Sequence, residues 1–252
     1  MRLPTLLAFD TATDVCAVAL AHGDKVIERS ETVGQSHSSR VLPMAQQLLA
    51  DAGVALSELD AVAFGAGPGS FTGLRIACGV AQGLAYGIDR PVVPVGNLAA
   101  LAFNAAQEQP AARRIVAAID ARMNEVYWAL YETTGEPDRP LVERIAPSLS
   151  AAAALPAQLH SALDGEAADT LAGEAFAVFA GALDAIPAAR RLPQARASAG
   201  AILRLAQRAF ARGEAVAPAQ AAPLYVRDRV AQTIDERQAA RSAADLATGA
   251  AR

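Results

Sequence analysis

The sequence predicts an α/β protein of two lobes that share one topology, each with a mixed sheet flanked by helices. The length of 252 residues and the hydrophobic content of 53% suit one large domain or two lobes of ordinary size. Short apolar runs alternate with segments whose apolar residues recur at helical spacing. The opening pattern of strand, aspartate, polar turn and strand also returns at an offset of 110 residues, where Asp10 falls on Asp120.

In the first half, the pattern predicts a meander of three strands followed by a helix. Val41, Ala45 and Leu48 recur at helical spacing after a cluster of capping residues, and Gly53 follows them. A glycine-rich loop then leads into a second, long helix that ends near Tyr86. The remaining predicted strands and helices of this half, in chain order, are Thr5–Phe9, Val15–Ala21, Lys25–Glu31, Ala61–Gly65, Val92–Val95 and Leu98–Ala106.

A polar stretch at 107–114, with a proline and paired arginines, marks the predicted boundary between the lobes. We therefore expect an N-terminal lobe at 1–108, a C-terminal lobe at 109–232 and a mobile tail at 233–252 that has no apolar face. In the second lobe the pattern predicts strands at Ile115–Ile119, Glu125–Tyr131 and Thr170–Gly173, a helix over Ile202–Phe210 and an extended segment at Leu224–Val226.

The composition narrows the class of function. A net charge of −4 without a basic stripe argues against tight binding of RNA by this chain alone. No apolar run is long enough to span a bilayer, and the N-terminus lacks a secretory apolar region, so we expect a cytosolic protein with no membrane contact. Cys16 and Cys78 lie in separate apolar segments and are expected to be buried thiols.

The turn Asp10-Thr11-Ala12-Thr13 lies between two predicted strands, where an aspartate and backbone amides can hold a phosphate and a metal. Asp120-Ala121-Arg122 occupies the matching turn of the second half. Nucleotide contact by Asp10, Thr11 and Thr13 is one interpretation, and hydrogen bonding within the turn is the other. Ala12 stands where close approach of backbone to phosphate would favour glycine.

The glycine-rich loop offers a second candidate for an anion site. Gly67, Gly69 and Ser70 precede a helix, whose first amides can face an anion. The loop lacks the Gly-Lys-Ser/Thr ending of a P-loop, and Gly67, Gly69 and Gly73 are spaced one residue too widely for a dinucleotide fingerprint. The alternative is that these residues and Pro68 only shape a sharp turn from strand to helix.

Three glycines in the long helix indicate close packing on one of its faces. Gly79, Gly83 and Gly87 recur every fourth residue, and each costs roughly 1 kcal/mol relative to alanine in a helix. Either another part of the same lobe packs unusually close, or a partner chain does. We expect an interface with a partner or a second copy, formed by Val41, Ala45, Leu48, Ile76, Gly79, Gly83 and Gly87.

Hydrolytic and metal chemistry find little support in the sequence. His22, His37 and His160 are scattered and show no spacing typical of metal ligands. Ser70 does not lie in a nucleophile elbow. We therefore assign no catalytic residue and no metal ligand.

Four motifs in order carry a resemblance to a known family. The chain reads FDTAT at 9–13, SHS with a following Leu-Pro at 36–43, GPGSFTGLR at 67–75 and PLYVRD at 223–228. This set resembles the bacterial TsaB family, formerly YeaZ, over essentially the whole chain up to about Ala231.

The resemblance implies two actin-like (ribonuclease-H-like) lobes of the ASKHA type. It also implies a scaffold role in making threonylcarbamoyladenosine, the modified base beside the anticodon of tRNAs that read codons starting with A. The expected partners are the catalytic TsaD subunit and the ATPase TsaE, with a homodimer when the chain is alone and tRNA contact only through the complex. No cofactor is expected to bind tightly, although ATP or ADP at the joint with a partner is an option.

The catalytic relative carries a pair of metal-binding histidines where this chain reads Asn97-Leu98-Ala99-Ala100-Leu101. The resemblance therefore implies that this chain is not an enzyme by itself. An actin-fold ATPase or small-molecule kinase that acts alone is the alternative, and a metallopeptidase is a third hypothesis.

Overall fold

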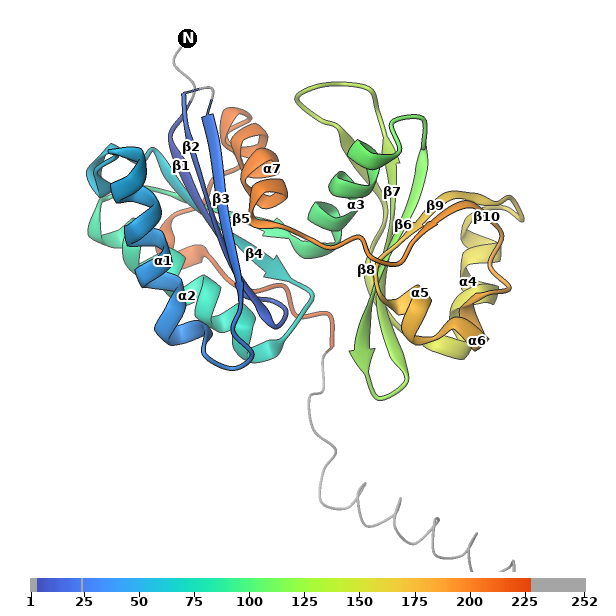
Figure 1. Cartoon of the computed structure of the whole chain (residues 1–252). Coiled ribbons are helices and arrows are strands. Elements are labelled where there is room, and N and C mark those ends of the chain that lie inside the picture. The colour runs from blue at the N-terminus through green and yellow to red at the C-terminus, as the bar shows by residue number, and fades with distance from the viewer. Residues whose placement is uncertain (1–3, 24, 228–252) are drawn as a thin grey trace, which may run out of the picture.

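The computed structural model describes residues 4–23 and 25–227, which form two mixed five-stranded sheets side by side (Figure 1). The first sheet has the order β3-β2-β1-β4-β5, and the second has the order β10-β9-β6-β7-β8. The strands of the first sheet are β1 (Leu6–Asp10), β2 (Val15–His22), β3 (Lys25–Thr32), β4 (Ala61–Gly67) and β5 (Val92–Gly96). Those of the second are β6 (Arg114–Arg122), β7 (Glu125–Thr133), β8 (Leu141–Ala151), β9 (Ala168–Ala172) and β10 (Ala188–Leu192).

The two sheets share one topology, as the internal repeat predicts. In each sheet the first strand of a three-strand antiparallel meander also pairs in parallel with the fourth strand, which pairs in parallel with the fifth. Asp10 ends β1, and Asp120 lies near the end of β6, at the equivalent point of the second sheet. The prediction of two α/β lobes built on one pattern is confirmed.

Helices cover both faces of both sheets. The helices beside the first sheet are α1 (His37–Ala52), α2 (Phe71–Gly87) and α7 (Ala199–Ala211), and α3 (Asn97–Glu108) lies between the two sheets (Figure 1). The outer face of the second sheet is covered by α4 (Leu155–Ala162), α5 (Ala175–Val178) and α6 (Ala180–Leu183).

Alternation along the strands explains why both faces of the first sheet are buried. Leu7 and Phe9 of β1 pack in the cluster that contains α1 and α2, whereas Leu6 and Ala8 pack in the cluster that contains α7. Successive side chains of a strand point to opposite faces, so an uninterrupted apolar run requires cover on both sides. All five residues of β1 are buried.

The chain returns to the first sheet after completing the second. Helix α7, which the predicted division at 108 and 109 places with the second lobe, packs against β1, β2, β4 and β5. Its buried residues Ile202, Leu203 and Ala206 lie in the same cluster as Leu6 and Ala8. Helix α3 is shared between the sheets, because it also packs on β6 and β7. The face of the first sheet that carries Leu6 and Ala8 therefore needs a second helix, and α7 provides it.

The predicted strands and helices are all present, and their bounds differ from the predicted ones by a few residues. The predicted tail at 233–252 lies outside the described residues. None of the helices in residues 4–23 and 25–227 is long and apolar enough to cross a membrane.

Candidate functional site

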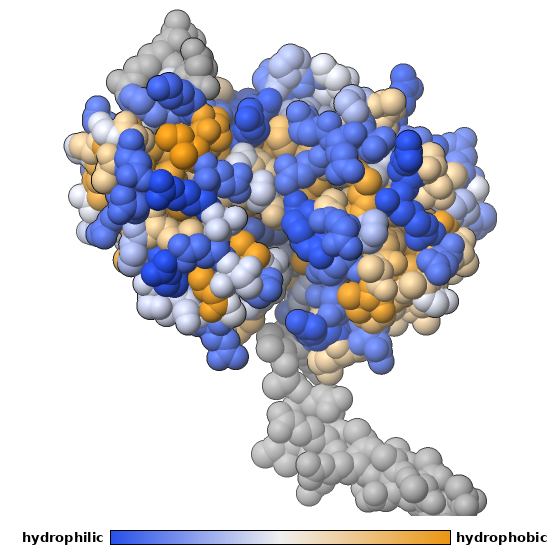
Figure 2. All heavy atoms as spheres, in the orientation of Figure 1, coloured by the Kyte–Doolittle hydropathy of each residue, from blue (hydrophilic) through white to orange (hydrophobic). Residues whose placement is uncertain are grey.

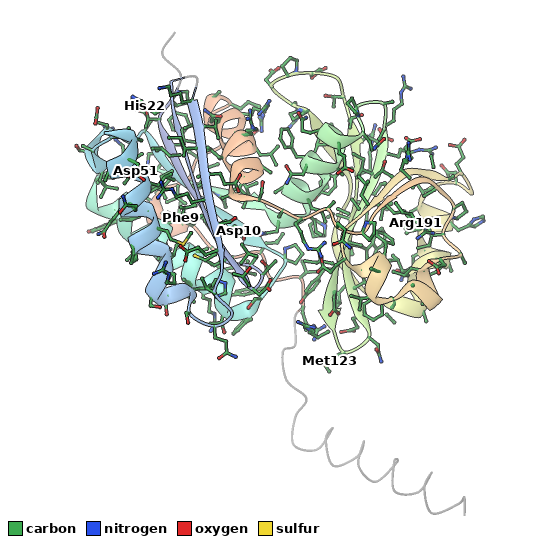
Figure 3. The ribbon with its side chains drawn as sticks, viewed as in Figure 1. Phe9, Asp10, His22, Asp51, Met123 and Arg191 are labelled. Carbon is green, nitrogen blue, oxygen red and sulfur yellow. The ribbon has the colours of Figure 1, made fainter. Side chains whose placement is uncertain are left out.

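Asp10 lies in a buried network at the end of β1 (Figure 3). Its Oδ1 accepts hydrogen bonds from the backbone N–H of Ala12 and from Nδ2 of Asn97, each over 3.0 Å. The Oδ1 of Asn97, at the start of α3, accepts a third bond from the N–H of Gly67 over 2.7 Å. Asp10 is 5% exposed and Asn97 4% exposed, so the amide of Asn97 bridges two backbone segments inside the protein.

Burial changes the acidity of this carboxyl group. Desolvation raises the pKa of Asp10 above its ordinary value, because the charged form loses its water. The bonds from Ala12 and Asn97 act in the opposite direction, and desolvation outweighs them. Asp10 therefore favours its protonated form more than an exposed aspartate does.

The turn after β1 packs directly on the first turn of α2. The N–H of Ser70 donates to the carbonyl of Ala12 over 2.8 Å, and the hydroxyl of Thr11 donates to the carbonyl of Gly73 over 2.7 Å. A Cβ atom at Gly73 would overlap the carbonyl oxygen of Thr11, and one at Gly69 would lie 2.7 Å from the Cβ of Ala12. These glycines allow two backbone segments of the same chain to touch.

The structure thus brings most of the predicted anion-binding residues together but uses their polar groups internally. The amides of Gly67 and Ser70 and the hydroxyl of Thr11 each have a partner within the chain. Thr13 is exposed and bonds only locally, where its hydroxyl accepts from the N–H of Val15. This geometry favours the interpretation of Asp10 and Thr11 as turn-forming residues, and nucleotide contact stays a prediction.

The glycine stripe of α2 lies on the outer surface. Gly79, Gly83 and Gly87 are exposed, and a Cβ at any of them would meet no described atom within 4 Å beyond the helix's own neighbouring backbone. The alternative in which another part of the same lobe packs against these glycines is therefore wrong. Nothing within residues 4–23 and 25–227 offsets the helix-destabilising effect of the three glycines at this surface.

Three of the predicted interface residues lie elsewhere. Val41, Ala45 and Leu48 are 0–2% exposed and belong to the core between α1 and the first sheet. Their helical spacing marks the face of α1 that packs on β2, so the prediction that a partner contacts them is corrected. Ile76 is half-buried and packs on the edge of the same core. The accessible part of the predicted surface is the row of glycines.

An arginine braced by two aromatic rings lies at the start of α2, and sequence reasoning did not identify it. The guanidinium carbon of Arg75 lies 3.8 Å from the ring centroid of Phe71, and Nε donates to the hydroxyl of Tyr225 over 3.0 Å. The two rings are 5.5 Å apart. Both rings belong to motifs of the sequence, but Arg75 and Tyr225 are 150 positions apart, and no local pattern indicates a contact over that separation.

A cavity of about 520 Å³ opens between α7 and the segment that precedes β8. Arg208 of α7 and Arg212, directly after the helix, line it, and they donate to the carbonyls of Pro137 and Asp138. Arg212 also pairs with Glu214, and burial lowers the pKa of Arg208. These two arginines join α7 to the second lobe, and their engaged donors leave little to recognise a ligand.

Side chains that could bind metal remain apart in the fold. The Nδ1 of His22 lies 3.2 Å from the hydroxyl of Thr5, His37 is buried at the start of α1, and His160 is exposed on α4. Within residues 4–23 and 25–227, no three His, Cys, Asp or Glu side chains gather as a metal site would require. On the face shown in Figure 2, hydrophobic and hydrophilic side chains are interspersed over both lobes.

Comparisons with known proteins agree with this architecture. A family model described as TsaD, tRNA N6-adenosine threonylcarbamoyltransferase, matches residues 29–239. The chain is 51% identical over 129 residues to the tRNA threonylcarbamoyladenosine biosynthesis protein TsaB of Haemophilus influenzae, with 51% of this chain and 54% of that protein covered. It is 47% identical over 127 residues to the protein of the same name from Escherichia coli, with 50% and 54% covered. The chain thus spans about half the length of the curated relatives it matches.

Solved structures match over nearly the whole chain. An uncharacterized protein with similarity to peptidase YEAZ from Pseudomonas aeruginosa superposes with a TM-score of 0.80 and 41% identity, covering 89% of this chain and 100% of that one. YeaZ from Pseudomonas aeruginosa gives a TM-score of 0.77 and 42% identity, covering 88% and 99%. With its two actin-like lobes, the chain belongs to the family that the threonylcarbamoyltransferase model describes, and within it to the TsaB (YeaZ) proteins.

Proposed function

We propose that this chain is a non-catalytic scaffold subunit in the synthesis of threonylcarbamoyladenosine, and that the outer face of α2 docks on the catalytic TsaD subunit. The modified adenosine lies beside the anticodon of tRNAs that read codons starting with A. The names of the TsaB relatives support the pathway, and the description of the matching family model supports the kind of partner.

The observation that carries the proposal is the open space over the glycines of α2. Gly79 and Gly83, in the interior of α2, together cost the helix about 2 kcal/mol relative to alanine, and no packing inside the described chain requires the three glycines. Glycines along one face let a second helix approach more closely than the usual 8–10 Å between axes. A partner helix packed in this space would explain why glycines occur at these three positions, although nothing in the free chain requires them.

The buried network supports placing the chemistry in the partner. Asn97 stands in the region where the catalytic relative is expected to carry its histidine pair, and its side chain is held by Asp10 and Gly67. An amide so engaged serves to fix β1, β4 and α3 relative to one another. This structural role of Asn97 fits a subunit that does not bind a catalytic metal at this position.

The remaining parts of the proposal concern the assembly. TsaE joins the complex, tRNA is contacted only within it, and two copies of the chain pair through the same α2 face when TsaD is absent. An exposed interaction surface tends to self-associate when its usual partner is absent. The chain alone holds no cofactor tightly, the joint between subunits is the place for ATP or ADP, and the site of action is the cytoplasm.

Gel filtration of the purified chain with TsaD from the same organism tests the proposal. We expect one stable complex, which Gly83→Leu abolishes by filling the space over α2. Gly181→Leu is the matched control, because Gly181 is also an exposed helical glycine with open space above it, on α6 of the other lobe. Failure of the unaltered chain to bind TsaD would contradict the proposal.

An ATPase or small-molecule kinase that acts alone is the competing function. Calorimetric titration of the chain with ATP and magnesium separates the two: tight binding with turnover by this chain alone would favour the kinase, and no heat would favour the scaffold. Metal analysis of the purified chain tests the metallopeptidase hypothesis, which requires stoichiometric zinc or iron.

A further inference from the structure

The exposed row of α2 begins with two large residues before the glycines. Phe71, Arg75, Gly79, Gly83 and Gly87 follow one another at intervals of four and are all exposed. Residues four apart lie above one another on a helix, so the guanidinium of Arg75 stands on the same face as the glycine stripe, at its N-terminal end.

The side chain of Arg75 is held in place before any partner arrives. Its guanidinium stacks on Phe71 at 3.8 Å, and its Nε is bound to the hydroxyl of Tyr225 at 3.0 Å. Tyr225 is in turn positioned by the neighbouring Leu224, whose N–H donates to the carbonyl of Ala66 over 2.7 Å. A pre-positioned arginine loses less conformational entropy on binding than a free one, which favours a specific contact.

The charge of Arg75 has no carboxylate partner among the described residues. Three other arginines of the first lobe and of its C-terminal segment do have such a partner: Arg29 pairs with Asp51, Arg40 with Glu31 and Arg227 with Glu125. No such ion pair of Arg75 exists within residues 4–23 and 25–227, and the sequence of α2 contains no acidic residue. The Nη atoms of Arg75 form no hydrogen bond in this part of the chain either, so both remain available for a bidentate contact.

We infer that Arg75 is the charged anchor of the α2 surface and that the partner presents a carboxylate, from a helix laid along the glycines, to its two Nη atoms. The inference rests on the proposed docking of TsaD and adds the chemistry that selects the partner. Stacking on Phe71 removes water from one face of the guanidinium, which strengthens its attraction to a carboxylate. The glycines set how close the partner helix comes, and Arg75 sets its register.

A second copy of this chain is the competing occupant. Its α1 and α2 offer one carboxylate, Asp51, which Arg29 and the Nε2 of Gln47 already hold. Asp89, exposed just beyond the end of α2, is the remaining candidate near this face. A different protein with an acidic residue of its own can pair with Arg75 without breaking the bonds that Asp51 makes to Arg29 and Gln47.

Calorimetric titration of TsaD into the chain at low and high salt tests the inference. We expect Arg75→Glu to weaken the complex by about a hundredfold or more and Arg75→Ala by about tenfold or more, because a charge at the interface loses its partner. Tyr225→Phe keeps the ring and removes one bond to Arg75, and should weaken binding less than Arg75→Ala. Raising the salt should weaken the unaltered complex more than the Arg75→Ala complex.

The matched control is Arg190→Glu, the same charge reversal on an exposed arginine of β10 at the far edge of the second sheet (Figure 1). It should leave the affinity unchanged, and thermal melting of each variant should report a folded protein. If the unaltered chain does not bind TsaD, the proposed function fails. If it binds, and Gly83→Leu abolishes binding while Arg75→Glu does not weaken it, the docking stands and the role of Arg75 is wrong.

Self-association provides the remaining outcome. If Arg75→Glu disrupts only the homodimer, and adding Asp89→Arg restores that homodimer, the occupant of this contact is a second copy and the inference is overturned. If Arg75→Glu weakens the TsaD complex and Asp89→Arg does not restore it, the carboxylate belongs to the partner.

Discussion

Asn97 donates a hydrogen bond from Nδ2 to Oδ1 of Asp10 over 3.0 Å, and both residues are buried. This bond joins the start of α3 to the end of β1, and the second bond of Asn97 adds the end of β4. The aspartate that marks the repeat in the sequence is therefore part of the internal structure of the first lobe. Its acidity is governed by burial, as its raised pKa reflects.

Asp10→Asn is expected to stabilise the folded chain at neutral pH. The new amide keeps an oxygen to accept from Ala12 and Asn97, and it removes a buried charge. Because the folded pKa of Asp10 is raised, its contribution to stability falls as the pH rises from below its ordinary value of 3.8 through the folded pKa. The variant should gain on the order of 1 kcal/mol near pH 7 in urea unfolding, and the gain should shrink on acidification. A loss of stability at neutral pH would contradict this account.

Gly73→Ala is expected to destabilise the chain strongly. The added methyl group would overlap the carbonyl of Thr11, and both atoms belong to backbone segments that cannot move independently. We expect a loss of about 3 kcal/mol or more in urea unfolding, or failure to fold. Gly87→Ala serves as the control, since open space surrounds that position and the substitution should be neutral or stabilising. Wild-type stability of Gly73→Ala would mean that the turn and α2 do not touch.

Arg227→Ala is expected to loosen the turn between β6 and β7. The Nη2 of Arg227 donates to the carbonyl of Ala121 and to Glu125, and its Nη1 lies 3.1 Å from the sulfur of Met123 at the tip of this hairpin (Figure 3). Residues 122–124 all have positive φ, a conformation that non-glycine residues adopt at some cost.

Hydrogen exchange measures this effect directly. Amides of residues 121–125 should exchange about tenfold faster in Arg227→Ala, which corresponds to about 1.4 kcal/mol. Arg122→Ala removes an exposed ion pair with Asp120 from the same turn and should change exchange little. Equal exchange in the two variants would show that Arg227 does not hold the hairpin.

Local patterns in the sequence predicted the elements of the first lobe, part of those of the second lobe and the repeat of the fold, but not β8, the short helices α4 to α6 or β10. Apolar runs gave the strands, and the repeat at Asp10 and Asp120 indicated one topology for both lobes. The placement of α7 was not predictable in this way, because an amphipathic helix shows that it covers a sheet without showing which sheet. The strand that precedes it, β10, belongs to the second lobe, while the apolar face of α7 packs on the first.

The candidate site was predictable only in part, for the same physical reason. The glycine spacing singled out one face of α2, but periodicity alone could not show whether that face is on the surface or buried. The face of α1 that carries Val41 turned out to be core. The brace between Arg75 and Tyr225 depends on the return of the chain after α7, which no local pattern reveals.

The double variant Gly79→Ala, Gly83→Ala tests the central claim most directly, by measuring stability and affinity on the same protein. Without a partner, each substitution should stabilise the helix by about 1 kcal/mol, because the added methyl groups meet no described atom. With TsaD, the same methyl groups should hold the partner helix away and weaken the complex by about tenfold or more in a calorimetric titration. A more stable chain that binds TsaD as tightly as before would contradict the claim that these glycines are there for a partner.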